Sequence, residues 1–339
     1  MKEVDPKIRI GAALHNWLRD GPDKEGPGVA WNKTVIDKTR ADIDFLSYHP
    51  YYPQATRKLV REAKPSIEKD KEYTSDVWFE AVMAGANQAL ADIREIWSTN
   101  NVPSRIGLVL SEYGIWPKAD TYSGEKKTPP EEWSNLARAL FDADLLMQLI
   151  KEAKSLNLTA ATSWNLHGVD EAAAIGNIWG AGNDWNTRST RPQYYALKML
   201  KDALASKRLV KADVTSSPGT FHTGRLANVK DQWVDCLEVL AAFPNTSTTS
   251  SLILVVINRS INKPFNATIT CPGFGANSYK TIAKLGHDVD WTAHNEDVEP
   301  VKQSESDPKK KALPGAGGFT FEPHSLTVLE FYVDPPEPQ

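Results

Sequence analysis

The hydrophobic pattern of this chain changes its period at about Leu209, and this change limits the folds that the chain can form. Before Leu209, short apolar runs alternate with longer segments whose apolar residues recur at the helical spacing of about 3.6. After it, short segments alternate apolar with polar residues, and no helical pattern follows. Alternating strands and helices predict a parallel sheet with crossover helices, whereas a series of short alternating strands predicts a β-sandwich.

The N-terminal part, residues 1–207, is therefore predicted to be half of a TIM-type (β/α) barrel. Four strands are expected, at residues 7–14, 44–48, 106–110 and 158–164. The expected helices cover residues 34–39, 75–99, 130–155 and 192–205. A complete barrel of this type has eight strands and about 250 residues, so these elements account for half of one.

The C-terminal part, residues 208–333, is predicted to be an all-β sandwich or jelly roll. Its clearest strand patterns lie at residues 252–258, 265–270, 280–284, 318–321 and 325–332. Residues 334–339 are rich in proline and are expected to form a disordered tail. The predicted fold class is thus α/β plus all-β.

Composition excludes several classes of function. The net charge of -4 and the lack of a basic stripe argue against nucleic acid as a partner. No apolar stretch approaches the ~20 residues of a membrane span, and the first residues lack the apolar core of a signal peptide. We therefore expect no membrane partner, and a chain that is either cytoplasmic or secreted with its signal absent.

The cysteines and histidines add two expectations. Cys236 and Cys271 could pair in a secreted protein, but two buried thiols are the preferred interpretation. The seven histidines are scattered and form no metal-binding motif, and there is no glycine-rich phosphate loop. We expect neither a metal nor a cofactor.

One carboxylate, Glu112, follows directly on an apolar run that reads as a buried strand, residues 106–110. A charge at that point is unfavourable unless the strand end opens into a polar cleft. In parallel α/β folds, the cleft beyond the carboxyl ends of the strands is where ligands bind and reactions occur. Glu112 is thus a candidate functional residue, and the alternative is a surface glutamate that begins a loop.

The other predicted strands also end in polar or aromatic residues. In chain order these ends carry His15/Asn16/Trp17, His49/Tyr51, Glu112/Trp116 and Trp164/Asn165/His167. Any one of them could be a packing residue, but four in succession describe a cleft with aromatic walls, a carboxylate and hydrogen-bonding groups. The chain also has eleven tryptophans, whose flat faces suit the stacking of sugar rings. A carbohydrate is the ligand that these features favour.

The sequence at this point resembles the C-terminal half of a clan A retaining glycoside hydrolase, and most closely a family 51 α-L-arabinofuranosidase. The resemblance rests on four segments of the N-terminal part, at residues 4–8, 43–49, 111–116 and 163–165. In the C-terminal part, residues 255–260, 294–300 and 323–329 are similar to the closing domain of that family. Glu112-Tyr113-Gly114 differs from the Glu-Trp-Asn that is common in the arabinofuranosidases, which leaves other clan A families open.

The resemblance implies an enzyme that cleaves glycosides of plant polysaccharides or oligosaccharides. Glu112 would be the nucleophile, with Tyr51 or His49 supporting its carboxylate. The resemblance also implies that Trp164 forms the floor under the sugar ring, with Asn165 and His167 reaching its hydroxyls. Trp17 and Trp116 are expected to line the cleft.

The acid/base carboxylate of that family is missing from the expected place. In clan A it belongs to an Asn-Glu pair at the end of the fourth strand, and no such pair precedes the first strand here. Asn295-Glu296 lies in the sandwich, and Glu171 is a weak substitute in a loop. The alternatives are therefore a non-catalytic carbohydrate-binding protein or an inactive fragment of a glycosidase.

A half-barrel also exposes two sheet edges, which readily pair with other strands. We expect self-association, a truncated sequence supported by its sandwich, or a separate N-terminal half-barrel as partner. Self-association and truncation are preferred to a natural two-chain enzyme.

Overall fold

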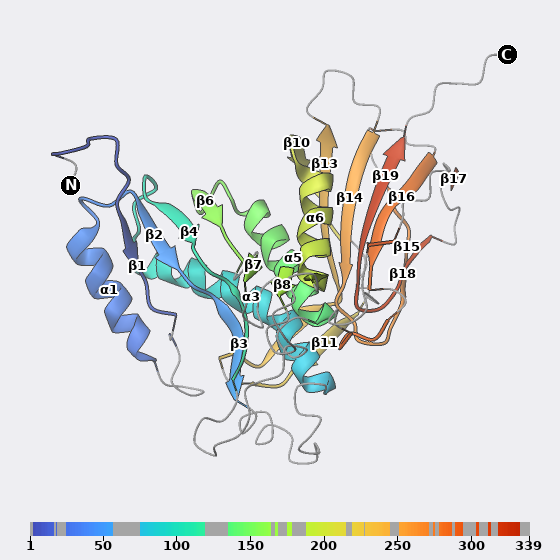
Figure 1. The fold of residues 1–339 in the computed structure, drawn as a ribbon, viewed down its shortest axis with the longest axis horizontal. Coiled ribbons are helices and arrows are strands. Elements are labelled where there is room, and N and C mark those ends of the chain that lie inside the picture. Colours follow the sequence, from blue (N-terminus) through green and yellow to red (C-terminus); the bar gives the residue numbers. More distant parts are fainter. Residues whose placement is uncertain are drawn as a thin grey trace.

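A computed structural model gives the fold of the chain (Figure 1). The ranges described here are residues 3–16, 18, 25–56, 75–118, 135–163, 167–168, 175–177, 188–214, 219–226, 228–244, 251–270, 274, 278–286, 289–293, 303–304, 311–312 and 318–332.

The N-terminal part is built on a four-stranded parallel sheet with the strand order β1-β2-β4-β6. These strands are β1 (Gly11–Ala13), β2 (Phe45–Tyr48), β4 (Gly107–Leu110) and β6 (Leu158–Ala161). All four lie within the predicted strands, although each is shorter than predicted. In the described part of the chain, β1 and β6 each pair with one strand only, so the sheet is open. The predicted half-barrel is confirmed.

Four helices connect or follow these strands in the described ranges. They are α1 (Pro27–Thr39), α3 (Asp76–Thr99), α5 (Leu136–Lys151) and α6 (Pro192–Leu204). Each begins where local chemistry permits: Pro27 and Pro192 occupy first turns, where a missing N–H needs no partner, while Ser75 and Asn135 cap α3 and α5 with side-chain oxygens.

Two helix boundaries differ from the prediction. Helix α1 begins at Pro27 rather than at residue 34, because its buried face consists of Gly28, Asn32 and Ile36 and gives little apolar signal. Helix α5 begins at Leu136 rather than at residue 130, and residues 131–134 lie outside the described ranges.

A second parallel pair continues past the ends of β2 and β4 and was not predicted. It joins β3 (Tyr51–Thr56) to β5 (Gly114–Lys118). Pro53 and Pro117 lie in these strands, and proline is typical of turns or edge strands because it has no N–H to donate. β3 begins three residues after β2 and continues beyond its end (Figure 1), and β5 begins two residues after Glu112.

Three short strands follow β6. These are β7 (His167–Gly168), β8 (Ile175–Asn177) and β9 (Arg188–Thr190), which form a sheet in that order.

The C-terminal part is built on a six-stranded sheet with the order β10-β13-β14-β19-β16-β17. Its strands are β10 (Lys207–Val210), β13 (Leu237–Pro244), β14 (Ser251–Asn258), β16 (Ser278–Leu285), β17 (Lys311–Ala312) and β19 (Ser325–Tyr332). All pairs in it are antiparallel. Two further antiparallel pairs join β11 (Thr220–Thr223) to β12 (Gln232–Asp235) and β15 (Phe265–Ala267) to β18 (Phe319–Phe321).

Helices α3, α5 and α6 lie between the two main sheets, so this part of the molecule has three layers, whereas α1 lies on the outer side of β1 (Figure 1). One face of the six-stranded sheet packs on the helices: Val255, Leu326 and Val328 belong to the same core as Ile93 and Leu140. Because this core includes residues of both parts, the predicted division at residues 207/208 stays a prediction.

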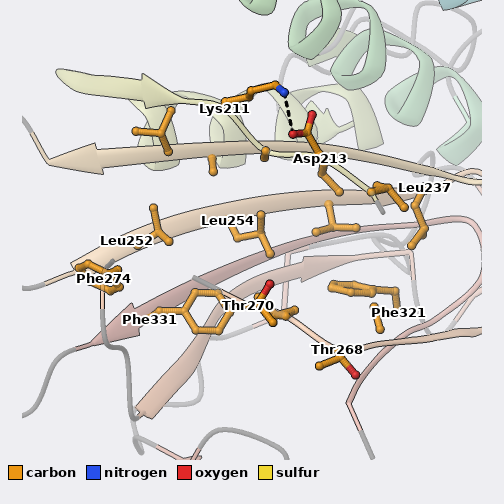
Figure 2. A pocket seen from close by; sticks show the side chains of 18 of the residues that line it. Lys211, Asp213, Leu237, Leu252, Leu254, Thr268, Thr270, Phe274, Phe321 and Phe331 are labelled. Carbon is orange, nitrogen blue, oxygen red and sulfur yellow. Dashed lines mark ion pairs between the residues drawn. The ribbon is translucent and has the colours of Figure 1, made fainter. Parts of the chain in front are cut away.

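The other face of the six-stranded sheet forms a second, smaller core with β15 and β18. A cavity of about 690 Å³ lies against this face. Leu252, Leu254, Phe321 and Phe331 point into it (Figure 2), while the Lys211–Asp213 ion pair lies at its margin.

A buried ion pair ties α5 to the six-stranded sheet. Arg259, which follows β14, donates to Asp144 of α5 through Nε at 2.7 Å and through Nη2 at 2.5 Å. Arg259 Nη2 also donates to Glu238 of β13 at 2.9 Å. Both Arg259 and Asp144 are almost fully buried, so this contact fixes the helix layer against the sandwich.

Candidate functional site

Glu112 lies two residues beyond β4, at the carboxyl end of the parallel sheet. Burial increases along the chain at this point: Ser111 is exposed, Glu112 is part-exposed and Tyr113 is buried. Its side chain is 30% exposed, which gives a ligand access to the carboxylate.

Tyr51 is the hydrogen-bond donor to this carboxylate. Its Oη donates to Glu112 Oε2 at 2.8 Å. Burial, followed by the hydrogen bond to Glu112 and by its charge, raises the pKa of the Tyr51 phenol above the ordinary value of 10.0. The phenol therefore keeps its proton, and remains a donor, well above neutral pH.

His49 is the second polar neighbour of Glu112. Its Nδ1 lies 3.6 Å from Glu112 Oε2, and its Nε2 lies 2.6 Å from Ser111 Oγ. Ser111 Oγ in turn lies 2.6 Å from Ser47 Oγ of β2. Since β2 and β4 are neighbours with Tyr48 opposite Leu110, the residues after each strand meet at the same edge.

Trp116 is the aromatic neighbour of Tyr51 in this group of residues. Its ring packs edge-on against the ring of Tyr51, with centroids 5.0 Å apart and an interplanar angle of 85°. Trp116 is part-exposed and lies at the same edge of the sheet as Glu112.

Contacts with α3 and with Asn228 hold strand β3 in place, and these contacts fix the direction of the Tyr51 side chain. Tyr52, the next residue, points to the opposite side and donates from Oη to the buried Asp92 of α3 at 2.5 Å. Gly85 of α3 allows this approach, because a Cβ there would lie 2.6 Å from the Tyr52 carbonyl oxygen. Asn228 holds the strand from its edge: its Nδ2 donates to Tyr51 O at 2.8 Å.

Of the residues expected in the site, the structure brings together Glu112, Tyr51, His49 and Trp116. Trp17, Trp164, Asn165 and Glu171 lie outside the described residues, and His167 is described only through the backbone of β7.

Three residues of the site were not singled out in the sequence. Ser111 and Asn228 are small polar residues in loops, and nothing in their local pattern distinguishes them from solvated ones. Arg138 does have a recognisable pattern, because with Asp142 it forms an i,i+4 pair of opposite charges inside an otherwise apolar stretch of α5. In the structure it is buried and donates to the carbonyl of Tyr113, the residue after Glu112.

Chemically, this arrangement presents a carboxylate held by a protonated phenol, an imidazole within reach, and an aromatic wall. Such a carboxylate is oriented and only partly desolvated, as a nucleophile or a base requires.

The described residues contain no cluster of three or more metal-ligating side chains. None of the described helices has both the length and the apolar composition needed to cross a membrane.

The cavity of the C-terminal part has a different character. Its lining combines leucines and phenylalanines with polar residues, among them Lys211, Asp213, Thr268 and Thr270 (Figure 2). Cys236 near this face is a buried free thiol, and Cys271 lies outside the described residues.

The fold resembles that of several solved glycosidases. An α-L-arabinofuranosidase from Thermotoga maritima in complex with arabinose matches 98% of this chain with a TM-score of 0.67 and 19% identity. A family 51 α-L-arabinofuranosidase from Bifidobacterium longum matches 98% of the chain with a TM-score of 0.62 and 21% identity. A family 86 glycoside hydrolase in complex with neoagarooctaose also matches 98% of the chain, with a TM-score of 0.54 and 13% identity.

The match covers only part of each of these structures. The chain spans 59% of the Thermotoga maritima enzyme, 60% of the Bifidobacterium longum enzyme and 44% of the family 86 enzyme. The chain thus has the fold of the C-terminal part of a family 51 enzyme, and its parallel sheet is not a closed barrel. No protein-family model matches the sequence, and no curated protein matches it either.

Proposed function

We propose that this chain carries the nucleophile of a retaining glycosidase, Glu112, and acts on α-L-arabinofuranosides or related glycosides of plant polysaccharides and oligosaccharides. The observation that carries the proposal is the 2.8 Å hydrogen bond from Tyr51 Oη to Glu112 Oε2 at the carboxyl end of the parallel sheet. The structural likeness to arabinofuranosidases supports the choice of sugar.

In the proposed reaction, a carboxylate oxygen of Glu112 attacks the anomeric carbon and forms a glycosyl ester. The bond from that carbon to the leaving-group oxygen breaks, and the leaving oxygen takes the electron pair. Water then hydrolyses the ester. Tyr51 keeps Glu112 oriented through both steps, and His49 lies close enough to act on the same carboxylate.

The sugar would lie against aromatic residues at the strand ends. Trp116 is proposed as one wall, Trp164 as the floor below the ring, and Trp17 as a further lining residue. We assign Asn165 and His167 to hydrogen bonds with the sugar hydroxyls.

The acid/base carboxylate is the open part of the proposal. Retaining hydrolysis needs two carboxyl groups about 5–5.5 Å apart, and within the described residues the polar contacts of Glu112 are with Tyr51 and His49. Glu171 of this chain is one candidate. A second copy of the chain, or a separate half-barrel that pairs with the open edges β1 and β6, is the other source.

A second candidate function is carbohydrate binding without catalysis, because the described contacts of Glu112 include no second carboxylate. Without an acid that protonates the leaving group, the cleft would bind carbohydrate and release it unchanged. Binding of arabinose-containing oligosaccharides with no turnover of any glycoside would favour this alternative.

A leaving-group series separates these possibilities. General acid catalysis contributes about 10²–10⁴-fold to such reactions, and a dinitrophenolate leaves without a proton whereas an alkoxide does not. We expect dinitrophenyl α-L-arabinofuranoside to be cleaved and methyl α-L-arabinofuranoside to be cleaved far more slowly if the acid is missing.

Glu112→Gln should abolish the cleavage of the dinitrophenyl substrate. Glu95→Gln, an exposed glutamate on α3, is the matched control and should leave the rate unchanged. Turnover that survives Glu112→Gln at the wild-type rate would contradict the proposal.

A further inference from the structure

Arg138 lies in an unfavourable place for a cation. It is in the first turn of α5, where the helix dipole repels positive charge, and its side chain is 1% exposed. A buried charge is tolerated only when it is paired and hydrogen-bonded. Its position therefore depends on the groups that it contacts.

These contacts join two strand ends through one guanidinium. Arg138 Nε donates to Asp142 Oδ1 at 2.7 Å, and Nη2 donates to the Tyr113 carbonyl oxygen at 3.1 Å. Nη2 also lies 3.4 Å from Ser163 Oγ, and this hydroxyl donates to Asp142 Oδ2 at 3.1 Å. Tyr113 follows Glu112 after β4, and Ser163 follows β6.

Gly114 packs closely against the guanidinium of Arg138. A Cβ on Gly114 would lie 2.4–2.5 Å from the guanidinium atoms of Arg138, so a side chain there would force the buried and hydrogen-bonded guanidinium to shift. The backbone that carries Glu112 therefore lies directly on Arg138, with no room between them.

The charges of Arg138 and Asp142 also affect the pKa of Tyr51, the hydrogen-bond donor to Glu112. After the larger effects of burial and of Glu112, the charge of Arg138 lowers the pKa of the Tyr51 phenol and that of Asp142 raises it. Burial raises the pKa of Asp142 itself, and Arg138 opposes this rise. Both charges are thus electrostatically close to the Tyr51–Glu112 hydrogen bond.

We propose that Arg138 is a positioning residue for Glu112. With Asp142 and Ser163 it fixes the backbone after Glu112 against the end of β6, and so sets the position of Glu112 relative to that strand end. The catalytic part of this inference rests on the proposed function, since the reaction of Glu112 is its readout.

The test compares Arg138→Met with Arg105→Met. Arg105 also holds backbone carbonyls, donating from Nη1 to Ile43 O at 2.9 Å, but at the opposite end of the same sheet. A small displacement of a catalytic group can lower the rate by about 100-fold. We expect Arg138→Met to lower kcat on the dinitrophenyl substrate by about this factor with KM little changed, and Arg105→Met to leave kcat unchanged.

Two milder variants refine the comparison. Arg138→Lys keeps the charge, but a single ammonium cannot hold Asp142 and two strand ends at once, so it should restore kcat only in part. Ser163→Ala removes the hydroxyl that contacts Arg138, Asp142 and the Tyr113 phenol, but leaves the guanidinium on the Tyr113 carbonyl, so it should have a smaller effect than Arg138→Met. Equal kcat in Arg138→Met and Arg105→Met, measured where both are folded, would overturn the inference.

A second measurement does not depend on activity. Gly114→Ala should destabilise the wild-type protein, but much less an Arg138→Ala background in which the guanidinium is absent. The amides of residues 112–116 and 160–163 should also exchange faster in Arg138→Met. If the wild-type chain proves inactive, the proposed function fails, and additive effects of Gly114→Ala and Arg138→Ala with unchanged exchange would then refute the positioning role by themselves.

Discussion

At the scale of single residues, the bond from Tyr51 to Glu112 gives a direct prediction. Tyr51→Phe removes the donor but keeps the ring that packs on Trp116. A hydrogen bond to a charged group contributes about 1.5–3 kcal/mol, so we expect the rate on the dinitrophenyl arabinofuranoside to fall by about 10- to 100-fold.

Tyr194→Phe is the matched control for this experiment. Tyr194 lies on α6 and packs edge-on against Tyr195, away from Glu112. Its substitution should leave the rate unchanged. A Tyr51→Phe variant as fast as Tyr194→Phe would show that the phenol does not support Glu112.

At the scale of elements, the contact of Arg259 with Asp144 should govern how α5 is held against the six-stranded sheet. Removing one partner of a buried ion pair typically lowers stability by about 3–5 kcal/mol. We therefore expect Arg259→Met to lower the free energy of unfolding in urea by about this amount, because Asp144 and Glu238 lose their shared donor.

Arg94→Met tests the opposite case. Arg94 is 54% exposed and pairs with Glu152 on the surface, and exposed pairs contribute less than about 1 kcal/mol. Similar losses in the two variants would mean that the buried pair is no more important than a surface one.

The elements also show what the sequence could predict. Strands β2, β4 and β6 and helices α3 and α6 follow from clear apolar patterns and caps. The strand ends also predicted Glu112 and Tyr51 as site residues, and the structure places these two side chains in hydrogen-bond contact. The pair β3–β5 was missed because its prolines suggest turns rather than strands. Arg138 was overlooked for another reason: a charge within an apolar helical stretch can be placed only when the facing strands are known.

At the scale of the whole molecule, four buried tyrosines should control the alkaline limit of stability. Burial is the first cause of the raised pKa of Tyr48, Tyr51, Tyr52 and Tyr113, above the ordinary value of 10.0. Stability is fully present below the unfolded pKa and falls as the pH rises beyond it, because only the unfolded chain then loses these protons. Each tyrosine lowers the free energy of unfolding by up to about 1.4 kcal/mol per pH unit.

This predicts a cooperative alkaline transition. As the pH rises past that ordinary value, the tyrosinate absorbance of these four residues should appear together with the loss of the far-ultraviolet circular dichroism. If all tyrosines titrate while the circular dichroism stays native, the four are not protected as the structure indicates.

The parallel sheet of this chain is open, and the acid/base carboxylate could come from a partner. The central claim for the chain itself is therefore that Glu112 is the nucleophile. If the acid/base carboxylate is absent, the step that breaks down the glycosyl ester is slowed as well, so the ester should accumulate. The direct measurement is peptide mass spectrometry after rapid quenching of the chain with dinitrophenyl α-L-arabinofuranoside. The account predicts one added arabinosyl group, on Glu112 and absent from Glu112→Gln. A quenched protein that carries no sugar, or carries it on another residue, would contradict it.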